Sequence, residues 1–332
     1  MKIKVNESKN SFPSSPVSQA RYMKTIFLGT PDFGAIILEG LIKSGNKPFL
    51  VITEADKPVG RKQIMTPPPV KVLAEKYGIP VAQPDKISNW KSEIENLKPD
   101  LGIIAAYGQI LPKDILDIPQ YGFVNVHPSL LPKYRGPSPI QATILNGDEK
   151  TGVTIMRISE KMDSGPILSQ KEMEINQGET FLSLHDRLAK VGSELLLDIL
   201  PKILKGQTPF ESQEKSKATY TKILKREDGK IDWRLPAKNI ERQIRAFDSW
   251  PGAYAMWNNL KIKIKKARLF HNPDGAKYPV GKVLVVPDNE IGIQCGDGDF
   301  LAVETLQLEG KKEVKAEDFL RGHDDFIGAI LK

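Results

Sequence analysis

Short apolar runs alternate with helical patterns along the first two thirds of the chain. Four runs rich in β-branched residues, each bounded by turn residues, predict strands buried on both faces of a parallel sheet. Between them, apolar residues recur at helical spacing, most clearly over residues 181–204. This alternation predicts an α/β fold with a doubly wound, mostly parallel sheet of the Rossmann-like kind. The four strand runs are residues 26–28, 49–52, 103–106 and 123–126.

The pattern changes after residue 207. Residues 208–225 are polar and basic with few large apolar side chains, which predicts a linker. One amphipathic helix follows, marked by Ile240 and Ile244, and then five short strand-like runs separated by turn residues. Five short strands after one helix predict a small C-terminal β-barrel, OB-like in kind. The five runs are residues 253–257, 261–265, 280–286, 291–294 and 300–308.

The first residues differ from the rest of the chain. Residues 1–22 are polar, rich in Ser, Pro, Lys and Asn, and lack the apolar core of a signal peptide, which predicts a disordered extension. Met23 opens the first apolar run and is a candidate initiation site, while an organelle-targeting segment is the less favoured alternative. The predicted units are therefore the extension (1–22), the α/β domain (23–207), the linker (208–225) and the β-barrel domain (226–332).

Composition narrows the class of protein. The chain has 332 residues, 40% of them hydrophobic and 27% charged, and no apolar run long enough to cross a membrane. Its single cysteine, Cys295, excludes an intrachain disulfide and a thiolate-rich zinc site. We therefore expect a cytoplasmic protein that works without a metal ion and without a membrane.

The charge points toward a polyanion. A formal net charge of +7 suits such a partner without establishing one. Lys261, Lys263 and Lys265 alternate with apolar residues, so a strand would project all three from one face. Two interpretations stay open: contact with nucleic acid, or a solvated edge strand that lysines keep from aggregating.

Two glycines follow the first apolar run. Gly29 and Gly34 are spaced G-x-x-x-x-G, which lacks the middle glycine of a dinucleotide-binding loop, and no Gly-Lys-Ser/Thr follows. We favour a tight strand-to-helix turn. A dehydrogenase, with Glu54 or Asp56 as the ribose-binding acid, is the alternative.

The most informative positions end the strand run at 123–126. Asn125 and His127 are two residues apart, so their side chains leave the same face of a strand, at the carboxyl end where open α/β sheets bind ligands. A polar pair there needs partners or a function, because burial of an unpaired amide or imidazole is costly. Asp163 by itself indicates only a turn, yet a strand over 152–156 could bring it to the same sheet edge. A hydrogen-bonded structural pair remains the alternative.

These residues stand in longer motifs. Residues 125–132, 135–136 and 163–165 resemble the signature of the folate-dependent formyltransferases. Seven further segments, in order along the chain, are similar to the branch of that family that formylates methionyl initiator tRNA. The similarity runs from about Met23 to near the end. The further segments are residues 29–33, 56–61, 69–73, 106–108, 110–112, 231–233 and 244–247.

The resemblance implies a reaction and a set of site residues. It implies N10-formyltetrahydrofolate as the donor and initiator methionyl-tRNA as the acceptor, in translation initiation, and we expect a monomer. It also implies that the second domain binds tRNA, with the loop around Arg61 at the acceptor end, although residues 62–65 are less basic than is usual in the family. By similarity, the catalytic residues are Asn125, His127 and Asp163, and the folate contacts are Ser129, Leu130, Leu131, Pro132, Ile110 and Leu111.

The expected mechanism needs no metal and no covalent enzyme intermediate, because the nucleophile is already an amine. The Asn125 amide and a protonated His127 would stabilise the oxyanion that forms as the amine adds, and Asp163 would favour the imidazolium. His185 and Cys295 are expected to take no part, with His185 on a solvated surface. Three alternatives remain: a nucleotide-linked amino sugar as acceptor, a purine precursor amine, which would need only the first domain, or a binding module without turnover.

Overall fold

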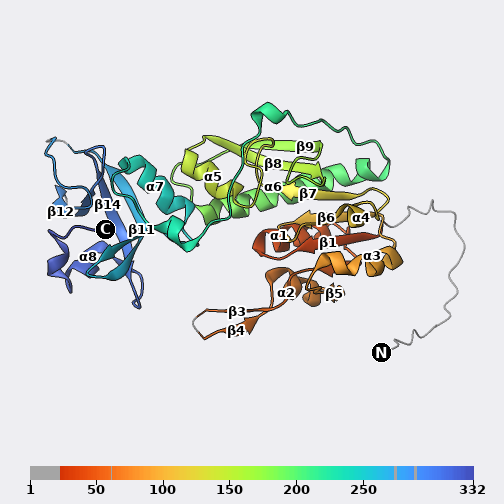
Figure 1. Cartoon of the computed structure of the whole chain (residues 1–332), viewed down its shortest axis with the longest axis horizontal. Helices are drawn as coiled ribbons and strands as arrows, with labels where there is room; N and C mark the ends of the chain where they lie inside the picture. The colour runs from red at the N-terminus through yellow and green to blue at the C-terminus, as the bar shows by residue number, and fades with distance from the viewer. Residues whose placement is uncertain (1–22, 61, 273–274, 288–289) are drawn as a thin grey trace, which may run out of the picture.

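The computed structural model describes residues 23–332 apart from residues 61, 273–274 and 288–289. The extension expected over residues 1–22 therefore lies outside the described residues. Two units lie end to end along the long axis of the molecule (Figure 1). The first contains an α/β sheet, and the second contains an antiparallel sheet with its own hydrophobic core.

A seven-stranded sheet forms the first unit, in the order β5-β2-β1-β6-β7-β8-β9. The first five strands of that order are parallel, whereas β8 pairs antiparallel with β7 and β9 antiparallel with β8. The mostly parallel sheet is as predicted from the sequence. The strands are β1 (Thr25–Gly29), β2 (Leu50–Ile52), β5 (Val81–Ala82), β6 (Leu101–Ala105), β7 (Phe123–His127), β8 (Lys150–Arg157) and β9 (Ile167–Glu174).

Helices cover both faces of this sheet because the strands are apolar on both. In β1, Phe27 packs into the core formed with α1 and α6, while Ile26 and Leu28 pack into the core formed with α3 and α4. This alternation is the doubly wound arrangement that the sequence predicted. The helices of the unit are α1 (Asp32–Lys43), α2 (Pro69–Lys76), η1 (Ile87–Trp90), α3 (Lys91–Leu97), α4 (Lys113–Leu116), α5 (Pro139–Asn146) and α6 (Phe181–Leu204).

A short hairpin extends from the first unit. Its strands are β3 (Lys57–Val59) and β4 (Ile64–Thr66), paired antiparallel with every residue exposed. The apolar side chains of Val59, Ile64 and Met65 are therefore in contact with solvent. Arg61, expected to contact tRNA, belongs to this turn of the sequence but lies outside the described residues.

The second unit begins with one helix and continues as an antiparallel sheet in the order β10-β11-β14-β13-β12, with β15 paired to β14. Five of its strands fall where the apolar runs predicted them. Two short 3₁₀ helices precede α7, η2 (Lys215–Lys217) and η3 (Arg226–Gly229), and another follows α8, η5 (Asp324–Phe326). The other elements are α7 (Ala237–Ala246), β10 (Tyr254–Trp257), β11 (Leu260–Phe270), β12 (Val283–Val286), β13 (Glu290–Gln294), β14 (Phe300–Leu308), β15 (Val314–Lys315) and α8 (Ala316–Leu320).

Residues 328–332 close this sheet into a barrel. On one side, the Val283 N–H donates to the Ala329 carbonyl at 2.9 Å, which joins the tail to β12. On the other side, Met256 of β10 and Lys332 exchange two backbone hydrogen bonds, at 2.7 and 3.1 Å. The tail thus lies between the two edge strands and satisfies backbone groups of both.

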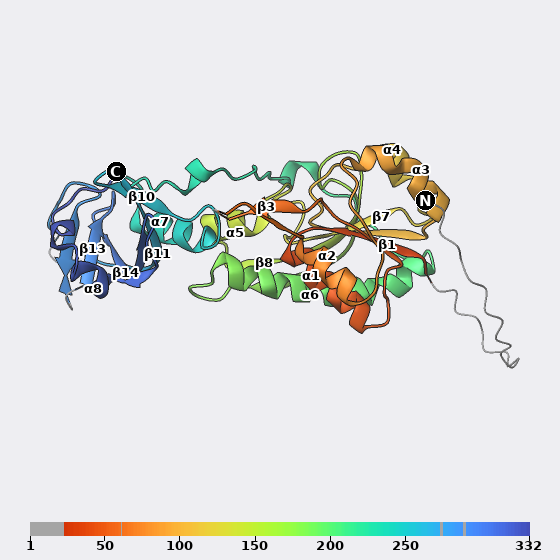
Figure 2. The ribbon, with the colours of Figure 1, turned by 90° about the horizontal axis from the view of Figure 1, so that it is seen from below.

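The segment between α6 and α7 runs back along the first unit, over β9 (Figures 1 and 2). A bridge between Ile167 and Glu211 joins it to β9, and a second bridge joins Arg135 and Tyr220. Residues 208–225 therefore contact the first unit at two points, a feature that their polar composition did not predict.

The two units meet where α7 packs against α5. The residues Ile240 and Ile244 of α7 belong to the core of the second unit, whereas Phe247, which follows the helix, belongs to the core of the first. The Arg242 guanidinium donates to the Asn146 carbonyl at 3.3 Å, and Arg245 donates to the Glu179 carbonyl at 2.9 Å. Apolar packing and charge-assisted hydrogen bonds therefore fix the junction.

Candidate active site

The structure places the predicted polar pair at the end of β7. Asn125 and His127 leave the same face of the strand, as expected, and the His127 side chain is almost fully buried, with 4% of the residue exposed. Its Nε2 lies 3.0 Å from the carbonyl oxygen of Tyr134. A carbonyl oxygen can only accept, so Nε2 carries the proton and donates it.

Asp163 approaches the other side of the imidazole. Its Oδ2 lies 3.8 Å from His127 Nδ1, which is an ion-pair distance and too long for a hydrogen bond. The same oxygen accepts a hydrogen bond from the Gly136 backbone N–H at 2.7 Å. Asp163, which is distant in the sequence, therefore converges with the Asn125 and His127 pair at the carboxyl end of β7, as predicted.

These contacts suit His127 to act as a hydrogen-bond donor. A neutral ring that donates from Nε2 would turn the lone pair of Nδ1 toward the carboxylate of Asp163, and the two would repel each other. The Gly136 N–H stabilises the ionised carboxylate. Both ring nitrogens face an acceptor, so a protonated ring could donate to a developing negative charge.

The Asn125 amide is available to a substrate. Its side chain is half-buried and has no hydrogen-bond partner among the residues that the structure describes. Because an amide without a partner loses its hydrogen bonds to water when a ligand covers it, Asn125 is suited to donate to a polar atom of that ligand. Asn125 and His127 are therefore two donors on one face of β7.

The loop after β7 is held from the adjacent strands. Thr154 of β8 donates to the Ser129 carbonyl at 2.7 Å and accepts from the Leu131 N–H at 3.1 Å. Gln170 of β9 donates to the Leu131 carbonyl at 2.8 Å. From the opposite side, the Thr219 hydroxyl accepts from the Tyr134 N–H at 2.8 Å. The carbonyl that faces His127 is therefore held in place by contacts on both sides of the loop.

The residues expected to contact folate divide into two groups. Ser129, Leu131 and Leu111 are buried, and the Ser129 hydroxyl donates to the Lys133 carbonyl at 2.7 Å, so these side chains support the loop. The side chains that a ligand can reach are Ile110, which is 80% exposed, and the half-buried Leu130 and Pro132.

Strained backbone marks the same sheet edge. Asp163 has φ +47°, Tyr134 has φ +60° and Ala106, which follows β6, has φ +53°. Residues with a side chain seldom adopt this left-handed conformation, and where they do the surroundings must hold them. The strain therefore accompanies the residues that place the Asp163 carboxylate and the carbonyl facing His127.

The turn between β1 and α1 needs its glycines for packing. A Cβ on Gly29 would lie 2.8 Å from the Ala105 carbonyl oxygen, and one on Gly34 would lie 2.7 Å from the same atom. Both candidate ribose-binding acids are paired within the protein: Glu54 forms an ion pair with Lys57 at 2.7 Å, and Asp56 forms one with Lys71 at 2.8 Å. The tight-turn interpretation is confirmed, and the dehydrogenase alternative loses its acid.

Sequence reasoning missed Tyr134, Thr154 and Gln213 at this site. Tyr134 acts through its carbonyl oxygen, for which a side-chain motif carries no signal. Its phenol is anchored by donation to Asp148 Oδ2 at 2.6 Å, and burial together with this bond raises the pKa of Tyr134 to about 12. Gln213 lies in the segment predicted to be a linker, and its contacts depend on the path of that segment.

The other candidate groups take no part in this site. His185 was expected on a solvated surface, and this placement was wrong: its side chain is 13% exposed, and its ring contacts Phe33 and Phe181 where α6 meets α1. Cys295 is 1% exposed, and burial raises the pKa of its thiol to about 12. In the described part of the chain, no group of three or more His, Cys, Asp or Glu lies together as metal ligands would.

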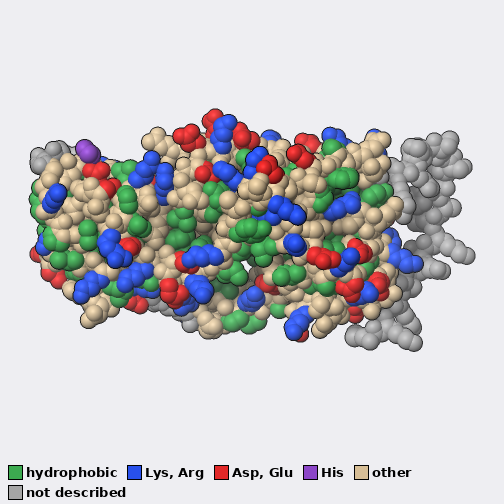
Figure 3. Space-filling model, turned by 45° about the horizontal axis from the view of Figure 1, so that its top comes forward, with side chains coloured by type: hydrophobic (Ala, Val, Ile, Leu, Met, Phe, Trp, Pro, Cys, Tyr) green, Lys and Arg blue, Asp and Glu red, His purple; other side chains and the backbone are tan. Residues whose placement is uncertain are grey.

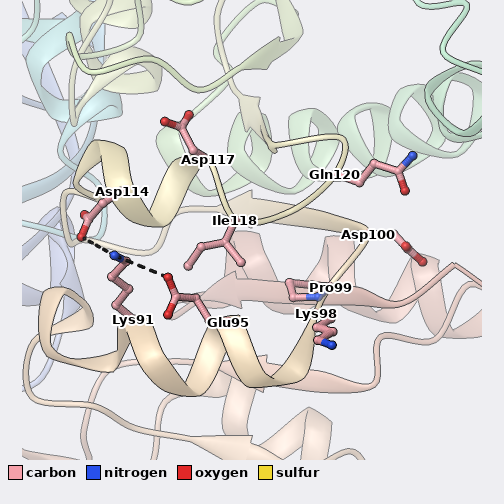
Figure 4. A pocket seen from close by; sticks show the side chains of 9 residues that line it. All are labelled: Lys91, Glu95, Lys98, Pro99, Asp100, Asp114, Asp117, Ile118 and Gln120. Carbon is pink, nitrogen blue, oxygen red and sulfur yellow. Dashed lines mark ion pairs between the residues drawn. The ribbon is translucent and has the colours of Figure 1, made fainter.

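A pocket lies at the other end of the parallel strands of the first sheet, away from the carboxyl end of β7 (Figure 4). Its lining residues precede β6 and β7, at the amino ends of these strands. Lys91 forms ion pairs there with Glu95 at 3.4 Å and Asp114 at 3.6 Å. The pocket is therefore separate from the site at the carboxyl end of β7.

The basic strand of the second unit lies inside its sheet. β11 is paired with β10 on one side and β14 on the other, so the edge-strand alternative is wrong. Lys261 lies over the Tyr254 ring at 4.0 Å, and Lys265 donates to the Asp248 carbonyl at 2.8 Å. Burial and the two neighbouring ammonium groups lower the pKa of Lys263. On the face that Figure 3 shows, basic side chains are spread over both units and mingled with acidic ones.

Comparison with known proteins gives the family. Residues 23–200 match the formyl transferase family, and residues 223–324 match the formyl transferase C-terminal domain. The chain therefore belongs to the formyl transferase family. Within it, the chain belongs with the methionyl-tRNA formyltransferases. It is 44% identical to the methionyl-tRNA formyltransferase of Bacillus velezensis and 42% identical to that of Bacillus subtilis, in each case over 93% of this chain and 97% of the relative.

Solved structures share the fold at lower identity. The N-formyltransferase of Helicobacter canadensis, solved with folinic acid and dTDP-3-aminofucose, has a TM-score of 0.64 and 22% identity over 85% of this chain and 98% of that one. HypX of Aquifex aeolicus, solved with tetrahydrofolic acid, has a TM-score of 0.62 and 18% identity over 92% of this chain and 47% of that one. None of the helices in the described ranges has the length and apolar character to cross a membrane.

Proposed function

We propose that this protein transfers the formyl group of N10-formyltetrahydrofolate to the amino group of methionyl initiator tRNA, for translation initiation. The observation that carries the proposal is the approach of the Asp163 carboxylate to His127 at 3.8 Å, beside the unpaired amide of Asn125. The 42–44% identity to methionyl-tRNA formyltransferases over 93% of the chain supports the acceptor.

In this proposal the folate lies against the exposed Ile110 and the half-buried Leu130 and Pro132. These side chains offer apolar surface for an aromatic ring system beside the two donors of β7, so the residues present fit a folate. The buried Ser129, Leu131 and Leu111 hold the shape of this surface. The donor supplies a formyl carbon bound to N10, and N10 gains a proton when that bond breaks.

The three polar residues have separate roles in the proposed reaction. The Asn125 amide and the His127 imidazolium donate to the formyl oxygen, where negative charge develops as the amine adds, and one such donor is typically worth about 10²–10³ in rate. Asp163 holds the imidazolium charge and lies where it can accept the proton that the amine loses. The acceptor amine replaces N10 on the formyl carbon, so no other reactant is needed.

The second unit binds the tRNA in this proposal. Residues 23–207 form the catalytic unit, 208–225 the connection and 226–332 the tRNA-binding unit, with Lys261, Lys263 and Lys265 facing the phosphates. We further propose that the protein acts as a cytoplasmic monomer. All the residues assigned to the two substrates belong to one chain, and the buried Cys295 thiol is unpaired.

Formylation of the charged tRNA tests the function directly. The purified chain is incubated with N10-formyltetrahydrofolate and methionyl initiator tRNA, and the aminoacyl product is measured by mass. We expect one formyl group on the methionine, and much slower formylation when His127→Ala replaces the wild type. Formylation of a nucleotide-linked amino sugar with no product on the tRNA would transfer the assignment to the sugar enzymes.

A further inference from the structure

The segment that joins the two units makes direct contact with the catalytic carboxylate's backbone. Gln213 lies in this segment, 50 residues after Asp163. Its Nε2 donates to the carbonyl oxygen of Asp163 at 2.9 Å and to that of Gly165 at 2.7 Å. Its Oε1 accepts from Nε and Nη2 of Arg135 at 3.0 and 2.8 Å. One side chain therefore connects both loops that build the site.

The geometry leaves a single orientation for the Gln213 amide. A guanidinium can only donate and a backbone carbonyl can only accept, so Oε1 must face Arg135 and the NH₂ group must face Asp163 and Gly165. In this orientation both amide hydrogens and both lone pairs of Oε1 are used. A fully satisfied amide holds its partners more tightly than a partly satisfied one.

The groups that Gln213 holds are those that aim the carboxylate. Arg135 precedes Gly136, whose N–H donates to Asp163 Oδ2 at 2.7 Å. Gln213 therefore holds the backbone of Asp163 on one side of that hydrogen bond and the side chain of Arg135 on the other. Asp163 has φ +47° and needs such support. Gly165 must stay a glycine, because a Cβ there would lie 1.8 Å from the Arg157 carbonyl oxygen.

We propose that Gln213 is a positioning residue for Asp163, so that the segment between the two units is a working part of the active site. This inference rests on the proposed function. Through its two N–H bonds Gln213 keeps the Asp163 carboxylate at its place opposite His127 Nδ1. It touches no substrate, and its effect on the reaction passes through Asp163.

Two substitutions distinguish the role of the accepting Oε1 of Gln213 from that of its donating NH₂ group. Gln213→Leu removes all four hydrogen bonds, whereas Gln213→Glu keeps an acceptor for Arg135 and removes both donors to Asp163 and Gly165. We expect both to lower kcat for formylation about tenfold or more, since a small displacement of a catalytic group has effects of that size. The KM values for tRNA and folate should change by less than about twofold, because binding surfaces are untouched. The matched control is Ser216→Ala, in the same segment, whose exposed hydroxyl bonds only Glu214.

A double-mutant cycle tests the route through Asp163. Asp163→Asn removes the charge that is being positioned, and asparagine tolerates a positive φ. In that background Gln213→Leu should cost less than about threefold, because residues that act as one unit are not additive. Equal fold losses in both backgrounds, unchanged kcat in Gln213→Leu, or full activity in Gln213→Glu would each overturn the inference.

The wild-type assay distinguishes this inference from the function on which it rests. If the wild type formylates methionyl initiator tRNA and the cycle is additive, only the role of Gln213 is refuted. If the wild type has no formylation activity, the proposed function fails before the cycle begins. Should Gln213→Leu fail to fold, Gln213→Glu retains the bond to Arg135 and carries the test alone.

Discussion

Hydrogen-bonding capacity decides which side chains at the β7 edge can act on a substrate. Ser129, Thr154 and Gln170 have used theirs on the loop that they support. No residue in the described part of the chain bonds the Asn125 amide, and His127 Nδ1 lies 3.8 Å from the Asp163 carboxylate, too far for a direct hydrogen bond. The side chains that can act on a substrate are therefore those whose hydrogen-bonding groups are not already used to hold the loop.

Removal of each catalytic side chain tests this view. We expect Asn125→Ala, His127→Ala and Asp163→Ala each to lower the single-turnover formylation rate by about 10²–10³, because each removes a group that meets charge developing in the transition state. Rapid-quench measurement with enzyme in excess over tRNA gives the rate, and thermal unfolding checks that the fold is intact. A folded His127→Ala variant with a near-normal rate would remove that residue from the mechanism.

The single thiol should be chemically silent in the folded protein. Burial raises the pKa of Cys295 to about 12, so only about one thiol in 10⁴ is ionised at pH 8, and access is closed as well. We expect a disulfide reagent to label the native chain far more slowly than the unfolded chain. Labelling at the rate of a free peptide thiol under native conditions would show that the second unit opens readily.

Secondary-structure elements were predictable where burial dictated the residue type. The parallel strands contain β-branched runs because both faces are covered, and residues 181–204 show helical spacing because one side of α6 lies on the sheet. β9 and the β3–β4 hairpin were missed because their residues are largely polar or exposed, so no apolar pattern marks them.

The sequence also predicted only part of the site. Asn125 and His127 follow from strand alternation, and Asp163 needed only a neighbouring strand to reach them. The Tyr134 carbonyl and the Gln213 amide depend on the path of backbone far away in sequence, and no local spacing encodes that path. The motif at residues 125–132 could therefore indicate the chemistry without revealing what holds it in place.

Residues 328–332 offer a test of how the barrel of the second unit is closed. Deletion of residues 328–332 would leave the edges of β10 and β12 unpaired and expose the core around Leu331. Several backbone hydrogen bonds and one buried leucine together suggest a destabilisation on the order of 5 kcal/mol. Chemical denaturation would measure it, with Lys332→Ala as the control that keeps the backbone pairing. An unchanged unfolding midpoint would mean that the sheet is stable while open.

At the scale of the whole molecule, the position of β11 inside its sheet changes the interpretation of its three lysines. An interior strand needs no protection from edge pairing, so the row of Lys261, Lys263 and Lys265 calls for another explanation. Two of the three make local contacts, with the Tyr254 ring and with Asp248, and Lys263 is held between the other two. A phosphate would relieve the repulsion among these ammonium groups.

Salt dependence measures that contribution. Substitution of Lys261, Lys263 and Lys265 by Gln should weaken tRNA binding and reduce the slope of log affinity against log salt by about 1 for each phosphate that the variant no longer neutralises, with little change in folate affinity. The matched control, Lys24, Lys91 and Lys98 to Gln, removes the same charge at the amino ends of the strands of the first sheet. An identical slope in wild type and the first variant would assign these lysines to solvent.

The helix α7 and the residue that follows it pack into the cores of both units, and this has a consequence for substrate choice. Ile244 is anchored in one core and Phe247 in the other, and Arg242 ties the junction to α5. These contacts hold the two units in a fixed arrangement. We therefore expect that an RNA substrate must be long enough to reach from the second unit to the active site. A series of charged minihelices of graded stem length should show a threshold below which formylation drops sharply, whatever base pairs the stem contains.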